Sequence, residues 1–354
     1  GHTINLRAGV PLPAPDLELP RLLSELRDGQ VGALLVLASN PVHAHPEGAA
    51  LSDLLRRAPL TVSTNDRADE TAQSCRFLAP DHAPAESWGD AEPRRGVLTL
   101  RQPALQPLFD TRSATESLLA WSGHPAEHHA LVRSRVDALA SRALRPEPTS
   151  AALWTRVQHE GHLEFHDEPL ADTLSLSGLA HLLAAPSIAR ADTELWLHPS
   201  VSLRDGRHAN NAWLHEVPDP LTKLVWDNAA CMAPSRGDAL GLRDGDLLRI
   251  SAAGRSVELP VVLQPGTHPD VIAVSLGYGR TAAGTVGNGI GVNVAPLAST
   301  TPAGVRLFGP ATFTPAGRAR DLSRSQTHAS LEGRPHIHTA TLAEFAREAT
   351  AGNP

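Results

Sequence analysis

Cysteine is scarce in this sequence, and its scarcity excludes two kinds of metal site. Cys75 and Cys231 are the only two thiols among 354 residues. Iron–sulfur clusters and structural zinc sites are held by sets of closely spaced cysteines, so we predict neither in this chain. The sequence leaves open whether Cys75 and Cys231 pair with each other.

Long apolar runs and an excess of basic charge are also missing. No run approaches the ~20 apolar residues of a membrane-spanning helix. The first residues lack the charged-then-apolar order of a signal peptide, so the sequence itself shows no localisation signal. The net charge is -7, with acidic and basic residues interspersed. We therefore expect no direct membrane insertion and no nucleic acid partner.

Histidine, by contrast, is frequent, with 18 in the chain. Three pairs lie close together in sequence: His43 with His45, His128 with His129, and His336 with His338. A metal site needs further ligands at a recognised spacing, and neither a carboxylate nor a third histidine supplies them here. We predict no metal site and expect these histidines at the protein surface.

The length of the chain favours two domains, because a single hydrophobic core stops growing below this size. Near the start, helix-like and strand-like segments alternate: helices at 20–27 and 49–57, strands at 31–37, 60–63 and 76–80. The segment 31–37 is apolar throughout, which indicates a strand covered on both faces of a parallel sheet. Three further helices are predicted at 113–121, 128–144 and 150–160. We predict a Rossmann-like α/β domain over residues 1–165.

Polar residues follow these strands where ligands bind in open α/β sheets. Asn40 precedes a proline, and Asp66 lies in an acidic loop. Either could bind a ligand, or each could do no more than begin a turn or cap a helix. Glu86 is a tempting catalytic carboxylate, but no second acid or histidine accompanies it at a diagnostic spacing, so we interpret it as structural.

The second half reads as a β-rich domain. A short helix with Ser235 as N-cap and Gly241 as its stop precedes two strands, which a turn at 252–255 joins into a hairpin. A third strand at 271–275 opens into a glycine-rich loop, which is either a surface loop or backbone that passes close to a ligand or to another segment of the chain. We predict a linker at 166–190, a barrel of six or seven strands at 191–308, and an irregular tail at 309–354 with one late helix.

Several long motifs in this part of the chain resemble a known family. The run from "GLRDGD" to "VSLGYGRTAAGTVGNGIGVN" resembles the C-terminal barrel of the molybdopterin oxidoreductase, or dimethyl sulfoxide reductase, superfamily. "PLTKLVWDNAA" and "ESWGDAEPRRGVLTLRQPALQPLFDTRSA" are similar to the molybdopterin-like iron–sulfur subunit of alternative complex III and its polysulfide-reductase-like relatives. The resemblance spans nearly the whole chain. It implies an α/β domain followed by a double-psi β-barrel of the molybdopterin dinucleotide-binding kind.

The resemblance also implies where a cofactor would lie. In family members that hold molybdopterin guanine dinucleotide, the strand-end Asn-Pro and the following acidic loop lie at its nucleotide end, where Asp66 could accept hydrogen bonds from the guanine edge. The loop at 206–213 and the glycine-rich loop approach the pterin. The cofactor-binding candidates are therefore Asn40, Asp66, Arg207, Asn210, Asn211, Arg280, Asn288 and Asn293.

Three functions stay open. The favoured one is the C-terminal part of a subunit of a respiratory, quinol-oxidising electron-transfer complex, a scaffold with or without the cofactor, docked to other domains or subunits. The resemblance puts such a complex at the extracytoplasmic face of a bacterial inner membrane. The alternatives are a fragment of a true molybdenum oxidoreductase and a non-enzymatic β-barrel binding module. We can assign no catalytic residue, and we expect this chain alone to lack activity.

Overall fold

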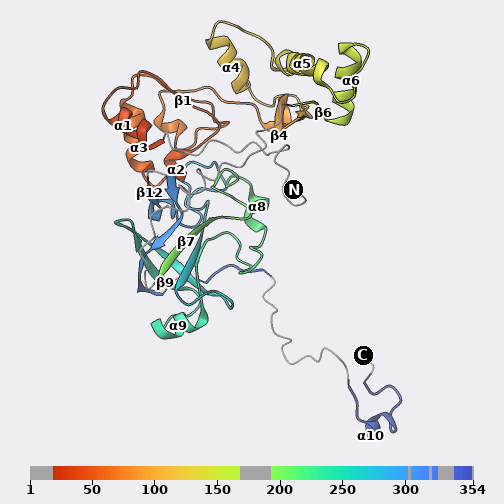
Figure 1. Ribbon diagram of the computed structural model, residues 1–354. Coiled ribbons are helices and arrows are strands. Elements are labelled where there is room, and N and C mark those ends of the chain that lie inside the picture. Colours follow the sequence, from red (N-terminus) through yellow and green to blue (C-terminus); the bar gives the residue numbers. More distant parts are fainter. Residues whose placement is uncertain (1–18, 168–192, 302–303, 319–320, 326–338, 353–354) are drawn as a thin grey trace, which may run out of the picture.

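The architecture is taken from a computed structural model. It describes residues 19–167, 193–301, 304–318, 321–325 and 339–352. Figure 1 shows the described elements in three main groups: one around α1 and α3, one around α4 to α6, and a large sheet that contains β7 and β9. The predicted linker, 166–190, lies almost wholly outside the described residues.

The first group is a three-stranded parallel sheet with helices packed on it. Its strand order is β1-β2-β3, and Leu23, Leu51 and Leu55 form its buried core. The predicted parallel α/β arrangement is thus confirmed. Its elements are α1 (Leu19–Arg27), β1 (Leu34–Val36), α2 (Pro41–Ala44), α3 (Gly48–Arg57), β2 (Thr61–Ser63) and β3 (Phe77–Leu78).

One expectation for this sheet is wrong. We expected the apolar segment 31–37 to be covered on both faces, but Leu35 and Leu37 are 42% and 46% exposed. The fully buried strand is β2, which lies in the middle of the sheet. β1 is an edge strand in this part of the structure, so its apolar side chains meet fewer neighbours.

The second group is antiparallel and has a core of its own. Its strands pair in the order β4-β5-β6, and Leu98, Val136 and Leu163 are buried between strands and helices. The predicted helix from 128 to 144 ends earlier, at Leu139, and a 3-10 turn, Ala140–Arg142, follows it. The elements are β4 (Gly89–Arg94), β5 (Val97–Arg101), α4 (Ala114–Trp121), α5 (His128–Leu139), α6 (Ser150–Glu160) and β6 (His162–Glu164).

The third group is a curled sheet of seven strands in the order β14-β7-β11-β8-β10-β9-β15. Two pairs are parallel, β7 with β11 and β8 with β10, and each is flanked by antiparallel pairs; the sheet ends in two antiparallel pairs, β10 with β9 and β9 with β15. Its strands are β7 (Glu194–Pro199), β8 (Ala230–Met232), β9 (Asp246–Ala252), β10 (Arg255–Leu263), β11 (Val271–Leu276), β14 (Phe308–Pro310) and β15 (Thr312–Arg318). The last strand lies in the region we predicted as an irregular tail.

Shorter elements complete the described chain. The predicted short helix is α9 (Pro234–Leu240); it ends at Gly241, as expected, but its N-cap is Ala233 rather than Ser235 because Pro234 takes the first helical position. The late helix of the tail is α10, drawn apart from the rest in Figure 1. The remaining elements are α8 (Ala212–Glu216), β12 (Ser299–Thr301), β13 (Gly304–Arg306) and α10 (Leu342–Phe345). None of the described helices is long and apolar enough to cross a membrane.

Candidate functional site

A cavity of about 380 Å³ lies where the first sheet meets the glycine-rich loop. One wall comes from the segments that follow β1 and β2, and the opposite wall from the loops at 205–210 and 280–283. This is the carboxyl edge of the parallel strands, where open α/β sheets bind ligands. Five predicted residues line this cavity together: Asn40, Asp66, Arg207, Asn210 and Arg280.

The other three predicted residues hold the walls in shape instead of lining the cavity. Asn211 is the N-cap of α8, and its side chain accepts a hydrogen bond from the Leu214 amide. Asn288 accepts one from the Ala283 amide at 2.7 Å within the glycine-rich loop. Asn293 donates to the His43 carbonyl at 3.0 Å and so joins the loop to α2.

Glycine is required in this loop because the backbone passes close to other segments. At Gly279 the backbone has φ +71°, and a Cβ would overlap the backbone of Asn293. At Gly284 φ is +104°, and a Cβ would overlap the side chain of Asn210. Of the two readings of this loop, close packing against other segments of the same chain is what the structure describes.

The lining arginines are already paired with acids. Arg67 binds both oxygens of Asp66, at 3.0 and 2.7 Å. Arg207 binds both oxygens of Asp205 in the same way, at 2.9 and 2.8 Å. Each pair lies between near neighbours in sequence, so it forms without help from the rest of the fold. The carboxylate of Asp66, our candidate for a guanine edge, therefore faces an arginine of its own loop.

The most strongly bound acid in the cavity region is Glu70, which the sequence did not single out as a candidate. Arg280 donates to its carboxylate from Nε at 3.0 Å and from Nη2 at 2.8 Å. The amides of Thr281 and Ala282 donate to Oε1 at 2.7 and 3.0 Å. Asn40 donates its side-chain amide to Oε2 at 2.8 Å. Asn40 accepts in turn from the Thr71 hydroxyl at 2.7 Å, so both ends of its amide are engaged.

Burial shifts the proton affinity of the groups around this pair. Burial alone would raise the pKa of Glu70, but hydrogen bonds from Arg280, Asn40 and the two loop amides hold that pKa far below its usual value. The neighbouring His43 is 5% exposed; burial and the positive charge of Arg280 lower its pKa to about 4. Burial raises the pKa of Asp69. At neutral pH the site thus holds an ionised Glu70 beside a neutral histidine.

These charges decide which cofactor the cavity suits. A pyrophosphate-bearing dinucleotide needs unpaired cations or amide donors, because its negative charges lose water on binding. Here the three lining arginines, Arg67, Arg207 and Arg280, each bind a carboxylate of the chain. The residues present therefore do not fit such a cofactor in this arrangement. Among the described residues, no group of three His, Cys, Asp or Glu side chains could hold a metal ion.

The remaining candidates have structural surroundings. Glu86 accepts hydrogen bonds from the amides of Ala83 and Leu108, which agrees with its structural interpretation. The expectation that the paired histidines lie at the surface is wrong for His43 and His45, which are both buried. His128 and His129 are half-buried. His336 and His338 lie outside the described residues.

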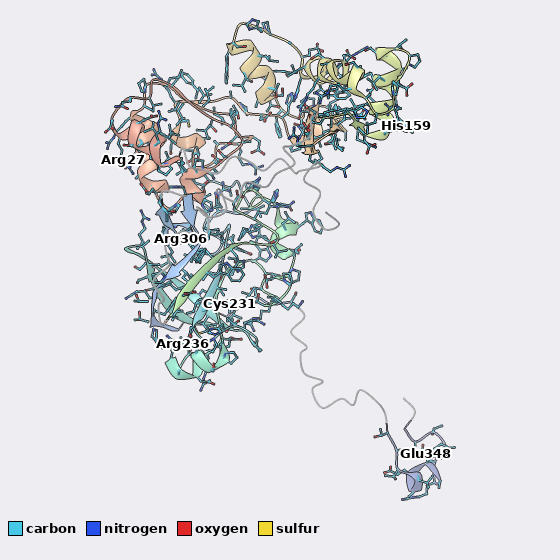
Figure 2. All side chains as sticks on the ribbon, in the orientation of Figure 1. Arg27, His159, Cys231, Arg236, Arg306 and Glu348 are labelled. Carbon is cyan, nitrogen blue, oxygen red and sulfur yellow. The ribbon has the colours of Figure 1, made fainter. Side chains whose placement is uncertain are left out.

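A second cavity, of about 730 Å³, lies on the large sheet away from these residues. Its lining is largely apolar and includes Trp196, Leu221, Cys231 and Tyr278. Cys231 is labelled within this sheet in Figure 2. Burial raises the pKa of its thiol to about 12, so the thiol is not ionised at neutral pH. This cavity contains none of the residues predicted from sequence.

Comparison with known proteins gives one relative by sequence and a neighbour by fold. No family model matches the chain. The menaquinone reductase molybdopterin-binding-like subunit of Nitratidesulfovibrio vulgaris (strain Hildenborough) is 28% identical over 302 residues, which cover 80% of this chain and 41% of that protein. The fold is similar to that of acetylene hydratase from Pelobacter acetylenicus, with a TM-score of 0.62 at 14% identity over 83% of this chain and 46% of the other.

The chain thus spans less than half the length of either protein it matches. The sequence match covers 80% of this chain, and the relative is named as a molybdopterin-binding-like subunit. The fold match covers a similar share of this chain. The predicted resemblance of this chain to the molybdopterin oxidoreductase superfamily is confirmed.

Proposed function

We propose that this chain is part of a molybdopterin-oxidoreductase-like subunit of a quinone-linked respiratory complex, in which it acts as a scaffold and not as a catalyst. The observation that supports this proposal most directly is that all three arginines lining the cavity form ion pairs with carboxylates of the chain. A pocket whose cations are already neutralised offers little to a phosphate-bearing cofactor. The name of the sequence relative, a subunit of menaquinone reductase, supports the respiratory setting.

Exposed apolar side chains support docking to neighbouring domains or subunits. Leu108 and Phe109 are 73% and 79% exposed on one loop. Trp213 and Leu221 are similarly exposed beside the large sheet. Large apolar groups gathered at a surface are typical of protein contacts.

The proposal places the assembled complex at the extracytoplasmic face of a bacterial inner membrane. Protease treatment of spheroplasts that express the complex tests this location. The protease would digest this subunit if the proposal is right and spare it if the subunit faces the cytoplasm.

The proposal includes the finer fold type. Alternation of parallel and antiparallel neighbours in the seven-stranded sheet supports a double-psi barrel of the molybdopterin dinucleotide-binding kind, preceded by a Rossmann-like domain. An experimental structure that left the sheet flat and open would contradict this part of the proposal.

A second function has one observation in its favour. Five residues chosen as cofactor ligands from the resemblance do line a single cavity at the carboxyl edge of the first sheet. A true molybdenum oxidoreductase with a guanine dinucleotide cofactor would use such a cavity, with Asp66 at the guanine edge. The two functions predict different affinities for guanine nucleotides.

Titration of the chain with GMP, followed by calorimetry, separates them. The scaffold proposal predicts millimolar or absent binding that Asp66→Ala does not change, because Arg67 already occupies the Asp66 carboxylate. Asp53→Ala, on the exposed face of α3, is the matched control. Micromolar binding that Asp66→Ala abolishes and Asp53→Ala leaves intact would overturn the scaffold proposal. Metal analysis of the chain purified with its partner subunits would then be expected to find molybdenum.

A further inference from the structure

The surroundings of Glu70 form a compact set of donors that converge on one point. The guanidinium of Arg280, the backbone amides of Thr281 and Ala282, and the side-chain amide of Asn40 all donate to the Glu70 carboxylate. The side chains of Arg280 and Glu70 are only 5% and 10% exposed. We call these four groups the oxyanion cradle.

Most of the cradle belongs to one loop, whereas its occupant comes from the other half of the chain. Arg280, Thr281 and Ala282 are consecutive, and Gly279 before them and Gly284 after them hold the backbone at positive φ. Glu70 follows β2, more than 200 positions earlier. The cradle is therefore set by the glycine-rich loop, and Glu70 is inserted into it from outside.

The chemistry of the cradle is not particular to a carboxylate. Successive backbone amides in a glycine-rich turn, together with an arginine fork, are the donors that proteins use for phosphate groups. A carboxylate presents two acceptor oxygens to them, and a phosphoryl group would present three. Burying Glu70 and Arg280 together costs free energy unless hydrogen bonds satisfy both groups, because both charges are withdrawn from water.

We propose that the cradle is a binding site for a phosphate-type oxyanion and that Glu70 is its built-in occupant, which closes the site and ties the glycine-rich loop to the first sheet. The inference goes beyond the scaffold proposal, because it concerns what this site binds once Glu70 is removed. A second link between the same parts, from Asn293 to the His43 carbonyl, keeps the cradle in place without Glu70.

The test uses the full 354-residue chain and inorganic pyrophosphate, with calorimetric titration at constant ionic strength. We expect no saturable binding to the unaltered chain. Glu70→Ala should bind pyrophosphate with a dissociation constant near or below ~1 mM, about what a few charge-assisted hydrogen bonds give. Adding Arg280→Met to Glu70→Ala should weaken that binding at least about tenfold, since the charged donor is lost. Arg249→Met added to Glu70→Ala is the matched control, because Arg249 pairs with Glu258 on the exposed β9–β10 hairpin and does not line the cavity.

Three results would overturn the proposal: saturable binding to the unaltered chain at the same affinity, no binding to a folded Glu70→Ala chain, or binding that Arg280→Met leaves unchanged. If Glu70→Ala does not fold, Glu70→Gln replaces it. Phosphate should then raise the thermal midpoint of Glu70→Gln more than chloride does at equal ionic strength, and an equal rise would refute the proposal. None of these results depends on the GMP titration. The scaffold proposal and the oxyanion-cradle proposal can therefore be refuted independently of each other.

Discussion

The buried histidine beside the cradle, His43, predicts a specific acid sensitivity. Its ring packs at the junction of α2 and the loop at 206, and Asn293 hydrogen-bonds to its backbone carbonyl. Burial is the main cause of its lowered pKa, and the positive charge of Arg280 lowers it further. The carboxylates of Glu70 and Asp205 face it too and oppose the shift only in part. Folding therefore holds this imidazole neutral.

The size and sign of the effect follow from the two pKa values. In the unfolded chain His43 takes up a proton near pH 6.5, whereas in the folded chain it does so near pH 4. Between these values the unfolded state binds more protons, so the free energy of unfolding falls as the pH falls. A tenfold difference in proton affinity is worth about 1.4 kcal/mol, so the loss reaches roughly 2 kcal/mol at pH 5 and about 3 kcal/mol at pH 4.

Neighbouring acids act in other parts of the pH range. Glu70, with a lowered pKa, stabilises the fold above its unfolded value of 4.5, and that stability is lost only as the pH falls further. Asp69, with a raised pKa, has the opposite sign, since the folded chain binds its proton more readily as the pH falls toward 3.8. Comparing the unaltered chain with a variant that lacks His43 separates the contribution of this histidine from those of the acids.

Urea unfolding at pH 7, 6 and 5, followed by circular dichroism, measures the effect. His43→Gln removes the titrating group, so the difference in unfolding free energy between the unaltered chain and this variant should shrink by roughly 2 kcal/mol from pH 7 to pH 5. His159→Gln is the control for replacing a histidine elsewhere: His159 is exposed on α6, in the group around α4 to α6, as Figure 2 shows. A pH-independent difference for His43→Gln would refute the reasoning.

Two further predictions concern packing and thiol chemistry. Gly287→Ala should lower the unfolding free energy by about 3 kcal/mol, because its Cβ would overlap the backbone of Ala209; Gly32→Ala, where nothing lies within 4 Å, should be nearly neutral, and equal urea midpoints would contradict the steric argument. Cys231, with a pKa of about 12 against 9.0 for an ordinary thiol, should react with iodoacetamide at pH 8 roughly a thousandfold more slowly than in the urea-unfolded chain, as mass spectrometry can follow. Comparable rates in both states would show that burial does not suppress this thiolate.

Local signals in the sequence were sufficient for most helices and strands. Helix α6 has the predicted bounds because Thr149 caps its start and Gly161, at φ +75°, ends it. The hairpin of β9 and β10 turns at Ala253 and Gly254, both at positive φ, as the turn at 252–255 predicts. These features depend on neighbours in sequence, so a single sequence is enough to find them.

Features that depend on distant contacts were missed or misjudged. β15 pairs with β9 across more than 60 positions, and its sequence, with proline and glycine inside it, resembles a loop. His43 looks like a surface residue in the sequence, but the segments at Gly206 and Asn293 pack against its ring. Of the candidate site, the sequence located the carboxyl edge of the sheet, because strand order implies it. The sequence could not show which polar groups at this edge would form ion pairs or hydrogen bonds with other residues of the chain.

The residue at position 70 distinguishes the scaffold interpretation from the cofactor interpretation. An anionic ligand that enters the cradle must first displace the Glu70 carboxylate, which leaves a buried acid without Arg280, Thr281 and Ala282 as donors. Stranding one partner of a buried ion pair costs about 3 to 5 kcal/mol, a few hundred-fold or more in affinity. A related chain that holds a phosphate group in the same loop must therefore carry something other than an acid at this position. An acid here, bound by Arg280, is by the same reasoning a mark of a chain that keeps the fold and leaves this site closed.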